Sequence, residues 1–179
     1  MLKRFRGYVF LFGVAGLIVA LDQWTKWLVR TNLPEGGTWS PEWLGWLSPY
    51  ARVIHWYNSG AAFGMFQGAS TVFAVLAFIV VGAILYYYPR VEQGDWTLRL
   101  AMAMQLAGAL GNLIDRLLFK GLVTDFISVG TFPVFNVADA SISVGVVVLL
   151  LGAWVRERKE KQEAGEDNAQ SSVTGNSET

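Results

Sequence analysis

Six polar side chains lie in or beside two apolar segments in the second half of the chain, where they could carry out acid–base chemistry. They are Asn112, Asp115, Arg116, Asp125, Asn136 and Asp139. Ionisable groups at the mouth of a membrane bundle are energetically costly, so they usually mark a functional site. Asp115 and Arg116 could instead form an ion pair at a helix end. Asp125 and Asp139 have no adjacent cation in the sequence.

Two carboxylates from different segments are the groups that an aspartyl protease uses. When two carboxylates lie close together, both cannot ionise cheaply, so the pair shares a proton. The ionised member takes a proton from water, and the protonated member polarises the scissile carbonyl and supplies the leaving amine. Residue type alone leaves Asp115, Asp125 and Asp139 as candidates, although Arg116 should keep Asp115 ionised.

Other chemistries receive less support from the sequence. The chain has no cysteine, which excludes a disulfide framework, a thiolate metal site and a cysteine nucleophile. The aspartates could supply oxygen ligands to a metal ion, but we expect neither a metal nor a cofactor. We interpret His55 as a loop or interface side chain. A serine–lysine protease would need an activated serine beside Lys26, and no serine lies in such a motif.

The composition indicates an integral membrane protein with one domain over residues 1–155. The chain has 179 residues, of which 53% are hydrophobic and 16% charged, and its zero net charge argues against nucleic acid as a partner. Each of four apolar runs has the length of about 20 residues that a helix needs to cross a bilayer. They cover residues 8–29, 69–88, 98–119 and 134–155. We therefore predict an all-α membrane protein with four transmembrane helices.

Residues 30–68 predict a small lobe between the first two transmembrane helices. Residues 51–57 are typical of a strand, so the lobe should contain β-structure. Tryptophans settle where membrane meets water, which favours a lobe resting on the membrane surface; they are Trp39, Trp43, Trp46 and Trp56. Small residues at 59–64 would let the backbone come close to a peptide. For residues 120–133 we expect a loop.

The first apolar run could be a cleaved signal peptide or a retained helix. Asp22, Lys26 and two tryptophans follow the run without a small-residue cleavage site, which favours a retained helix. Asp22 and Lys26 are four residues apart on one helix face, with the acid nearer the N-terminus. They could pair with each other or act as a strut facing the site, and we favour the structural role.

The distribution of Lys and Arg predicts the orientation in the membrane. Nine lie at the N-terminus, in the second loop and at the start of the tail: Lys3, Arg4, Arg6, Arg90, Arg99, Arg156, Arg158, Lys159 and Lys161. Four lie on the opposite side: Arg30, Arg52, Arg116 and Lys120. Both termini should then be cytoplasmic, with the lobe and the polar residues towards the outer face. Residues 156–179 become polar and acidic, which predicts a disordered cytoplasmic tail.

Spacing places the polar residues on the faces of helices that should meet. Gly108, Asn112 and Asp115 fall at i, i+4 and i+7, on one stripe of the third helix. In a membrane bundle small residues permit close packing and polar residues turn inward. Asn136 and Asp139 are one turn apart at the start of the fourth helix.

Five blocks of residues resemble the signature blocks of bacterial lipoprotein signal peptidase (signal peptidase II), a family of membrane aspartyl peptidases. They are Asp22-x-x-x-Lys26, Asn58-x-Gly60-Ala61-Ala62-Phe63-Gly64, Gly108-x-x-Gly111-Asn112-x-x-Asp115-Arg116, Val123-x-Asp125-Phe126 and Phe135-Asn136-x-Ala138-Asp139-x-x-Ile142. Together they cover roughly residues 15–145 in the family's order, with no departure at a motif position. One block alone would be weak, but five in order are specific.

The resemblance implies that Asp125 and Asp139 are the catalytic pair. It also implies a set of residues that support the pair or contact the substrate: Asn58, Gly60, Ala61, Gly108, Asn112, Arg116, Asn136 and Ala138. Asp22, Lys26 and Asp115 would be structural polar residues. The implied substrate is a bacterial prolipoprotein whose cysteine carries a diacylglyceryl group, cleaved just before that cysteine. The implied setting is the bacterial cytoplasmic membrane, with lipid as a further partner, and we expect a monomer.

Two other function classes remain open. Intramembrane carboxylates also mark the paths of small transporters and proton-coupled channel components, although four spans without an internal repeat argue against a transporter. A non-catalytic assembly factor would use the tryptophan-rich lobe for binding and would leave the carboxylates unexplained. A requirement for both Asp125 and Asp139 in peptide cleavage distinguishes the peptidase from these alternatives.

Overall fold

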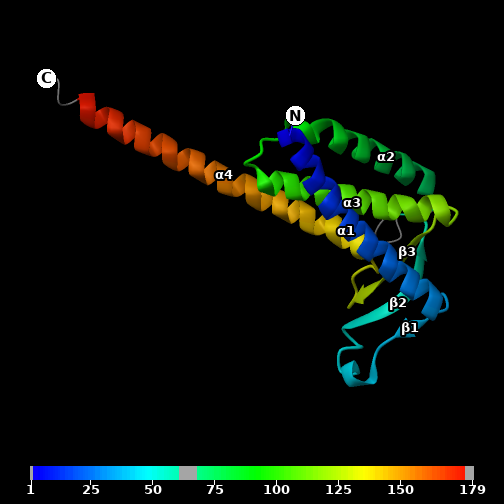
Figure 1. Cartoon of the computed structure of the whole chain (residues 1–179). Coiled ribbons are helices and arrows are strands. Elements are labelled where there is room, and N and C mark those ends of the chain that lie inside the picture. The colour runs from blue at the N-terminus through cyan, green and yellow to red at the C-terminus, as the bar shows by residue number, and fades with distance from the viewer. Residues whose placement is uncertain (1, 61–67, 176–179) are drawn as a thin grey trace.

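The structure is a computed structural model that describes residues 2–60 and 68–175. Its helices are α1 (Leu2–Asn32), α2 (Ser70–Tyr87), α3 (Trp96–Leu118) and α4 (Val137–Gly175), with short 3-10 helices η1 (Glu42–Leu44) and η3 (Tyr88–Arg90). The strands are β1 (Thr38–Trp39), β2 (Ala51–Asn58) and β3 (Val123–Val129). Figure 1 shows the sheet at one end of the helix bundle.

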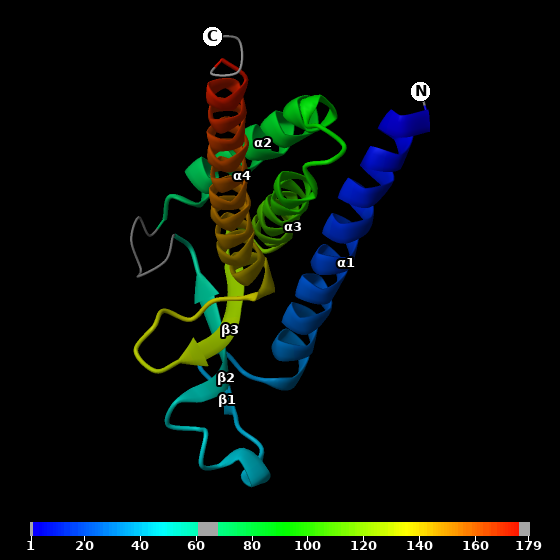
Figure 2. The ribbon, with the colours of Figure 1, turned by 90° about the vertical axis from the view of Figure 1, so that its left-hand side faces the viewer.

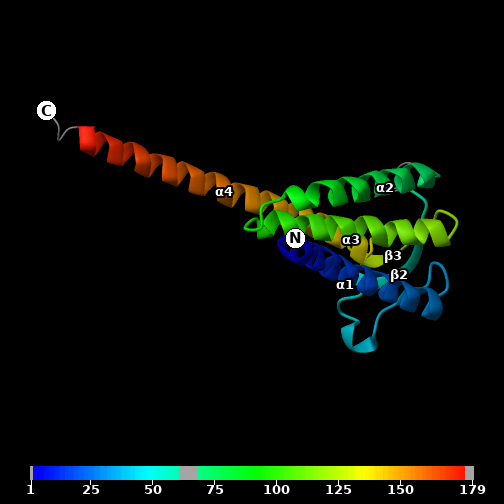
Figure 3. The ribbon, with the colours of Figure 1, turned by 45° about the horizontal axis from the view of Figure 1, so that its top comes forward.

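Helix α3 lies at the centre of the bundle, between α1 and α2, and also packs against α4 (Figures 2 and 3). Its buried residues run along its length: Arg99, Ala101, Ala103, Leu106, Ala107, Gly108, Gly111, Asn112, Leu113 and Asp115. In contrast α2, all of whose residues are described, buries only Ile84. The predicted stripe of Gly108, Asn112 and Asp115 is confirmed, because all three face the interior.

Glycines allow α3 to approach α1 and α4 closely. A Cβ atom added to Gly108 would lie 2.6 Å from the carbonyl oxygen of Ala138 and 2.4 Å from Cγ1 of Ile142. At Gly111 the added atom would lie 2.7 Å from Oδ2 of Asp22. Such contacts are too short for a side chain, so glycine at these positions lets α1 and the start of α4 pack closely against α3.

Three segments of the described chain are long and apolar enough to cross a membrane. They are Gly7–Asn32, Ser70–Arg90 and Val137–Arg158. Helix α3 does not meet the same criterion; it carries the polar residues Arg99, Gln105, Asn112, Asp115 and Arg116. Its position inside the bundle explains this composition, because polar side chains there face other helices rather than lipid. The chain is therefore a mostly helical membrane protein, and a fourth span stays a prediction.

The strands form an antiparallel sheet in the order β1-β2-β3. The strand predicted over 51–57 is confirmed as β2, but the loop expected over 120–133 was wrong, because β3 pairs with β2 along its length. The sequence Val-Thr-Asp-Phe-Ile-Ser-Val of β3 is rich in the β-branched and aromatic residues that strands favour. The sheet thus combines residues 38–58 with a strand from the α3–α4 connection.

The end of the chain differs from the expectation of a disordered tail. Helix α4 continues to Gly175 and projects away from the bundle (Figure 1). Residues 156–164, Arg-Glu-Arg-Lys-Glu-Lys-Gln-Glu-Ala, are strong helix formers, which explains the continuation. Glu157 and Lys161 form an ion pair of 2.6 Å at i and i+4.

Candidate active site

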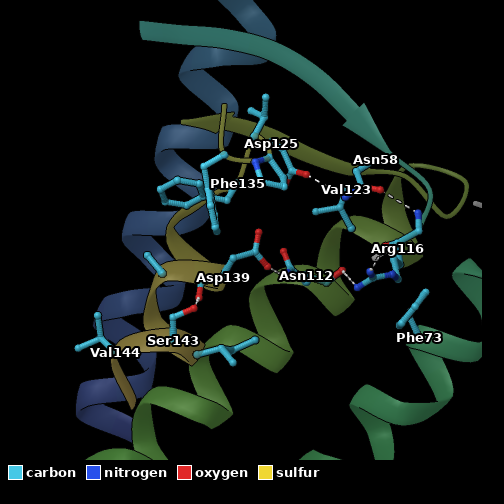
Figure 4. A pocket seen from close by; sticks show the side chains of 16 residues that line it. Asn58, Phe73, Asn112, Arg116, Val123, Asp125, Phe135, Asp139, Ser143 and Val144 are labelled. Atoms are coloured by element: carbon cyan, nitrogen blue, oxygen red, sulfur yellow. Dashed lines mark hydrogen bonds between the residues drawn. The ribbon is translucent and has the colours of Figure 1, made fainter. Parts of the chain in front are cut away.

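A pocket of about 580 Å³ lies where the sheet meets the bundle. Its walls come from β2, α2, α3, β3 and the start of α4, and several of them are apolar, including Phe73, Phe135 and Val144. The polar residues at the pocket are Asn58, Asn112, Arg116, Asp125, Asp139 and Ser143. Figure 4 shows Asp125 on the strand and Asp139 on the helix at this one pocket. The fold therefore brings the two predicted aspartates together.

Asp125 is held on β3 by two asparagines. Its Oδ2 accepts a hydrogen bond of 3.0 Å from Nδ2 of Asn58 on β2, and its Oδ1 accepts one of 2.7 Å from Nδ2 of Asn136. The residue is 1% exposed. Burial raises the pKa of Asp125 to about 7, and the negative charge of Asp139 acts in the same direction. Asp125 can therefore keep a proton close to neutral pH.

Asp139 belongs to the first turn of α4 and caps it together with Asn136. The backbone N–H of Asp139 donates to Oδ1 of Asn136 at 3.0 Å, and the backbone N–H of Asn136 donates to Oδ2 of Asp139 at 3.2 Å. This reciprocal pair is a capping box, in which each side chain satisfies a free N–H at the helix start. The same sequence feature that begins α4 thus fixes the direction of the Asp139 carboxylate.

Asn112 and Asn136 link the two carboxylates. Nδ2 of Asn112 donates to Oδ1 of Asp139 at 2.7 Å, and Oδ1 of Asn112 accepts from Nδ2 of Asn136 at 3.0 Å. Because Asn136 also donates to Asp125, the four side chains form a continuous chain of hydrogen bonds from β3 through α3 to α4. Each amide here uses both its donor and its acceptor.

Asp115 lies outside this chain, and it does not form the ion pair with Arg116 that the sequence left open as an alternative. Asp115 is 0% exposed and its oxygens lie 3.4 Å from Nζ of Lys26 and 3.6 Å from Nη1 of Arg30. It also accepts from the backbone N–H of Thr124 at 2.9 Å, so it anchors the strand that carries Asp125. Consecutive residues on a helix do not face each other, which explains why Asp115 and Arg116 separate.

Arg116 points to the pocket instead. Its guanidinium donates at 3.4 Å to the carbonyl oxygens of Asn112 and Gly60 and lies 5.4 Å from the ring centre of Phe73. Its Nε has no hydrogen-bond partner within the described part of the chain. Gly60 itself is held by its backbone N–H, which donates to Oδ1 of Asn58 at 2.9 Å.

The pair of Asp22 and Lys26 is confirmed, with 2.9 Å between the charged atoms, and both residues are 0% exposed. Oδ1 of Asp22 accepts from the backbone N–H of Ala138 at 2.9 Å, which joins α1 to the start of α4. Ala138 is 0% exposed and Gly108 contacts its carbonyl oxygen, so a small residue is needed at both positions. Ala61 lies outside the described residues.

Some residues of this network were missed by the sequence analysis. Arg30 donates to Oγ1 of Thr124 at 2.9 Å, and Gln23 donates to Oδ1 of Asp115 at 3.1 Å. Arg30 follows Lys26 by one helical turn, a spacing that could have indicated a shared partner. Gln23 and Thr124 are ordinary polar residues, and only their neighbours Asp22 and Asp125 mark their positions.

Comparison with known proteins agrees with this arrangement. A family model described as signal peptidase (SPase) II matches residues 14–155. The chain is 39% identical to the lipoprotein signal peptidase of Shouchella clausii, over 83% of this chain and 95% of that protein. It is 38% identical to the lipoprotein signal peptidase of Listeria monocytogenes serovar 1/2a, over 86% and 97% respectively.

A solved structure, described as a bacterial membrane enzyme studied by the in meso method at 2.3 Å resolution, has a similar fold. Its TM-score is 0.75 at 30% identity, and the match covers 84% of this chain and 90% of that one. The sequence blocks, the fold and the relatives agree, and the chain belongs to the signal peptidase II family of membrane peptidases.

Proposed function

We propose that this chain is an aspartyl endopeptidase of the bacterial cytoplasmic membrane that removes the signal peptide from diacylglyceryl-modified prolipoproteins, cleaving before the lipidated cysteine. One observation carries the mechanism. Asp125 and Asp139 come from different elements, share Asn136 as a hydrogen-bond donor, and line one pocket. Two carboxylates so placed provide a base and an acid at a single peptide bond.

In this mechanism a water molecule between the carboxylates attacks the scissile carbonyl. The ionised aspartate takes the proton of the water, and the protonated aspartate donates to the carbonyl oxygen. A proton then passes to the leaving amine as the C–N bond breaks. Desolvation of the pocket strengthens these electrostatic interactions relative to water.

The names of the relatives and the apolar pocket walls support the substrate class. The matched relatives are lipoprotein signal peptidases, and Phe73, Phe135 and Val144 offer an apolar surface beside the carboxylates. A lipid on the substrate cysteine would hold the scissile bond at a fixed depth in the membrane. Asn58, Gly60 and Arg116 would contact the peptide backbone there.

The membrane arrangement that we propose has four spans, with both termini cytoplasmic and the pocket near the outer face. Helix α3 has 23 residues, or roughly 34 Å at 1.5 Å per residue, enough to cross the hydrocarbon. Gln105, Asn112 and Asp115 face α4, α1 and β3 rather than lipid, and Arg116 faces the pocket and Phe73 of α2. Their presence therefore does not oppose a span. The rival class, a small transporter, is not favoured, because the family is one of peptidases.

The decisive experiment compares the purified protein on a diacylglyceryl-modified precursor and on its unmodified twin. Asp125→Asn and Asp139→Asn each remove a proton donor or acceptor at almost constant volume. Each should lower single-turnover cleavage by about 10²–10⁴-fold or more while precursor binding persists.

Two controls make this test specific. The unmodified precursor should be cleaved poorly if the lipid positions the bond, and the double aspartate variant should be no slower than either single variant. Substantial cleavage by either aspartate variant that still binds precursor would reject the dyad. Equal rates on the two precursors would reject lipid recognition.

A further inference from the structure

Lys26 is completely buried beside the proposed dyad, and three oxygen-bearing side chains surround its ammonium group. Nζ lies 2.9 Å from Asp22 and 3.4 Å from Asp115, and it donates to Oδ1 of Asn112 at 3.0 Å. Two carboxylates are more than one ammonium needs for charge neutrality, and Arg30 supplies the second cation at Asp115. The third contact, to Asn112, is therefore not explained by ion pairing.

Lys26 and Asn136 both donate to the amide oxygen of Asn112, and together they determine which way this amide points. An ammonium group only donates hydrogen bonds, so the amide oxygen of Asn112 must face it. The amide nitrogen must then face the other way, where it donates to Oδ1 of Asp139 at 2.7 Å. If the amide were reversed, its NH₂ group would oppose the ammonium and its oxygen would oppose the Asp139 carboxylate.

The two aspartates consequently differ in what supports their negative charge. Asp139 accepts from Asn112, whose amide is polarised by a buried cation, and it also lies at the N-terminus of α4, where the helix dipole favours an anion. Asp125 lies on a strand, and its donors are Asn58 and an Asn136 amide that is shared with Asn112.

We propose that Lys26 is a positioning residue of the dyad, which acts through Asn112 to make Asp139 the ionised base and leaves Asp125 as the proton-bearing acid. This inference rests on the proposed peptidase mechanism and assigns the roles within it. Burial of Asp125, which raises its pKa to about 7, is consistent with the assignment.

The charged groups around the dyad determine how the pH dependence of cleavage should change when the charge of Lys26 is removed. Lys26 faces Asp22 from α1, Asp115 and Asn112 from α3, and acts on Asp139 of α4 and Asp125 of β3. Arg116 on α3 also acts near the dyad. Without the charge of Lys26, the base is harder to deprotonate, so cleavage should need a higher pH.

The test is the pH dependence of single-turnover cleavage of the lipid-modified precursor by the full chain. Lys26→Met should move the midpoint of the acidic limb up by about one pH unit or more. Because this variant leaves two buried carboxylates with less compensation, Asp22→Asn/Lys26→Met is measured in parallel. The double variant keeps the cluster charge unchanged and keeps an oxygen for the N–H of Ala138. It should shift the midpoint in the same direction but by less, because the negative charge of Asp22, which also acts on Asp139, is removed as well.

Arg30→Met is the matched control. Like Lys26, Arg30 supplies a cation at Asp115, but it contacts Thr124 rather than Asn112. The variant should therefore lower stability without moving the midpoint of the acidic limb. An unchanged midpoint in both Lys26 variants, or an equal shift in Arg30→Met, would overturn the proposal. If the proposed peptidase mechanism itself were wrong, the result would be different, because cleavage would survive Asp125→Asn or Asp139→Asn with Lys26 unchanged.

Discussion

Asp125 is the residue whose protonation should limit activity on the alkaline side. Its pKa is raised to about 7, so the carboxyl keeps its proton below that pH and loses it above. Because the acid must carry a proton, we expect cleavage to fall as the pH rises through about 7. The hydrogen bond from Asn58 lowers this pKa, so Asn58→Ala should move the fall to higher pH, whatever rate remains. Rates that stay constant up to pH 9 would contradict this role.

At the scale of residues, the sequence predicted that Asp125 and Asp139 come together, as they do at one pocket, but it did not predict all of their surroundings. Asp125, Asp139, Asn112 and Asn136 could be found because polar residues beside apolar runs are conspicuous. The partner of Asp115 could not be found in the same way. Adjacent residues in a helix point about 100° apart, so Arg116 does not face Asp115 although it follows it in the sequence. The partners of Asp115 are Lys26 and Arg30 on the neighbouring helix α1.

At the scale of elements, the packing of α3 against α4 sets the position of Asp139. In Gly108→Ala the new Cβ would meet the Ala138 carbonyl oxygen at 2.6 Å, so α4 must move away from α3. We expect a loss of about 1–3 kcal/mol in stability from overpacking and a lower cleavage rate as Asp139 leaves Asn112. Thermal unfolding in detergent and single-turnover cleavage measure the two effects.

Gly82 provides the control for this substitution, because a Cβ there meets nothing within 4 Å on the exposed face of α2. Gly82→Ala should preserve activity and, by its higher helix propensity, should not lower stability. If Gly108→Ala and Gly82→Ala behaved alike, close packing of α3 and α4 would not control the site.

The helices could be predicted from local sequence patterns, but one of the strands could not. All four long helices were predicted because their apolar runs are long. Strand β3 was missed, since seven residues that contain Asp125 and Ser128 lack the alternation typical of a half-buried strand. Its residues are buried on both faces over Val123–Phe126, and that burial depends on β2 and α1, which no local pattern encodes.

The charges of the whole molecule predict its direction in the membrane. Lys and Arg are concentrated near the N-terminus, around residue 90 and after residue 155, at the end of the bundle away from the sheet (Figure 1). The positive-inside rule places that end in the cytoplasm. On this prediction the sheet, the pocket and the exposed rings of Trp43 and Trp46 would lie at the outer surface.

Reporter fusions test this direction together with the fourth span. Fusions after residue 45 should read outside, and fusions after residues 93 and 165 should read inside. If α3 did not cross the bilayer, α4 would have to start from the cytoplasmic side, and the fusion after residue 165 would read outside. An inside result at residue 45 would place the pocket in the cytoplasm, where a precursor already carried across the membrane could not reach Asp125 and Asp139. When the fusion after residue 45 reads outside, a fusion after residue 121, between α3 and β3, reads outside only if α3 spans.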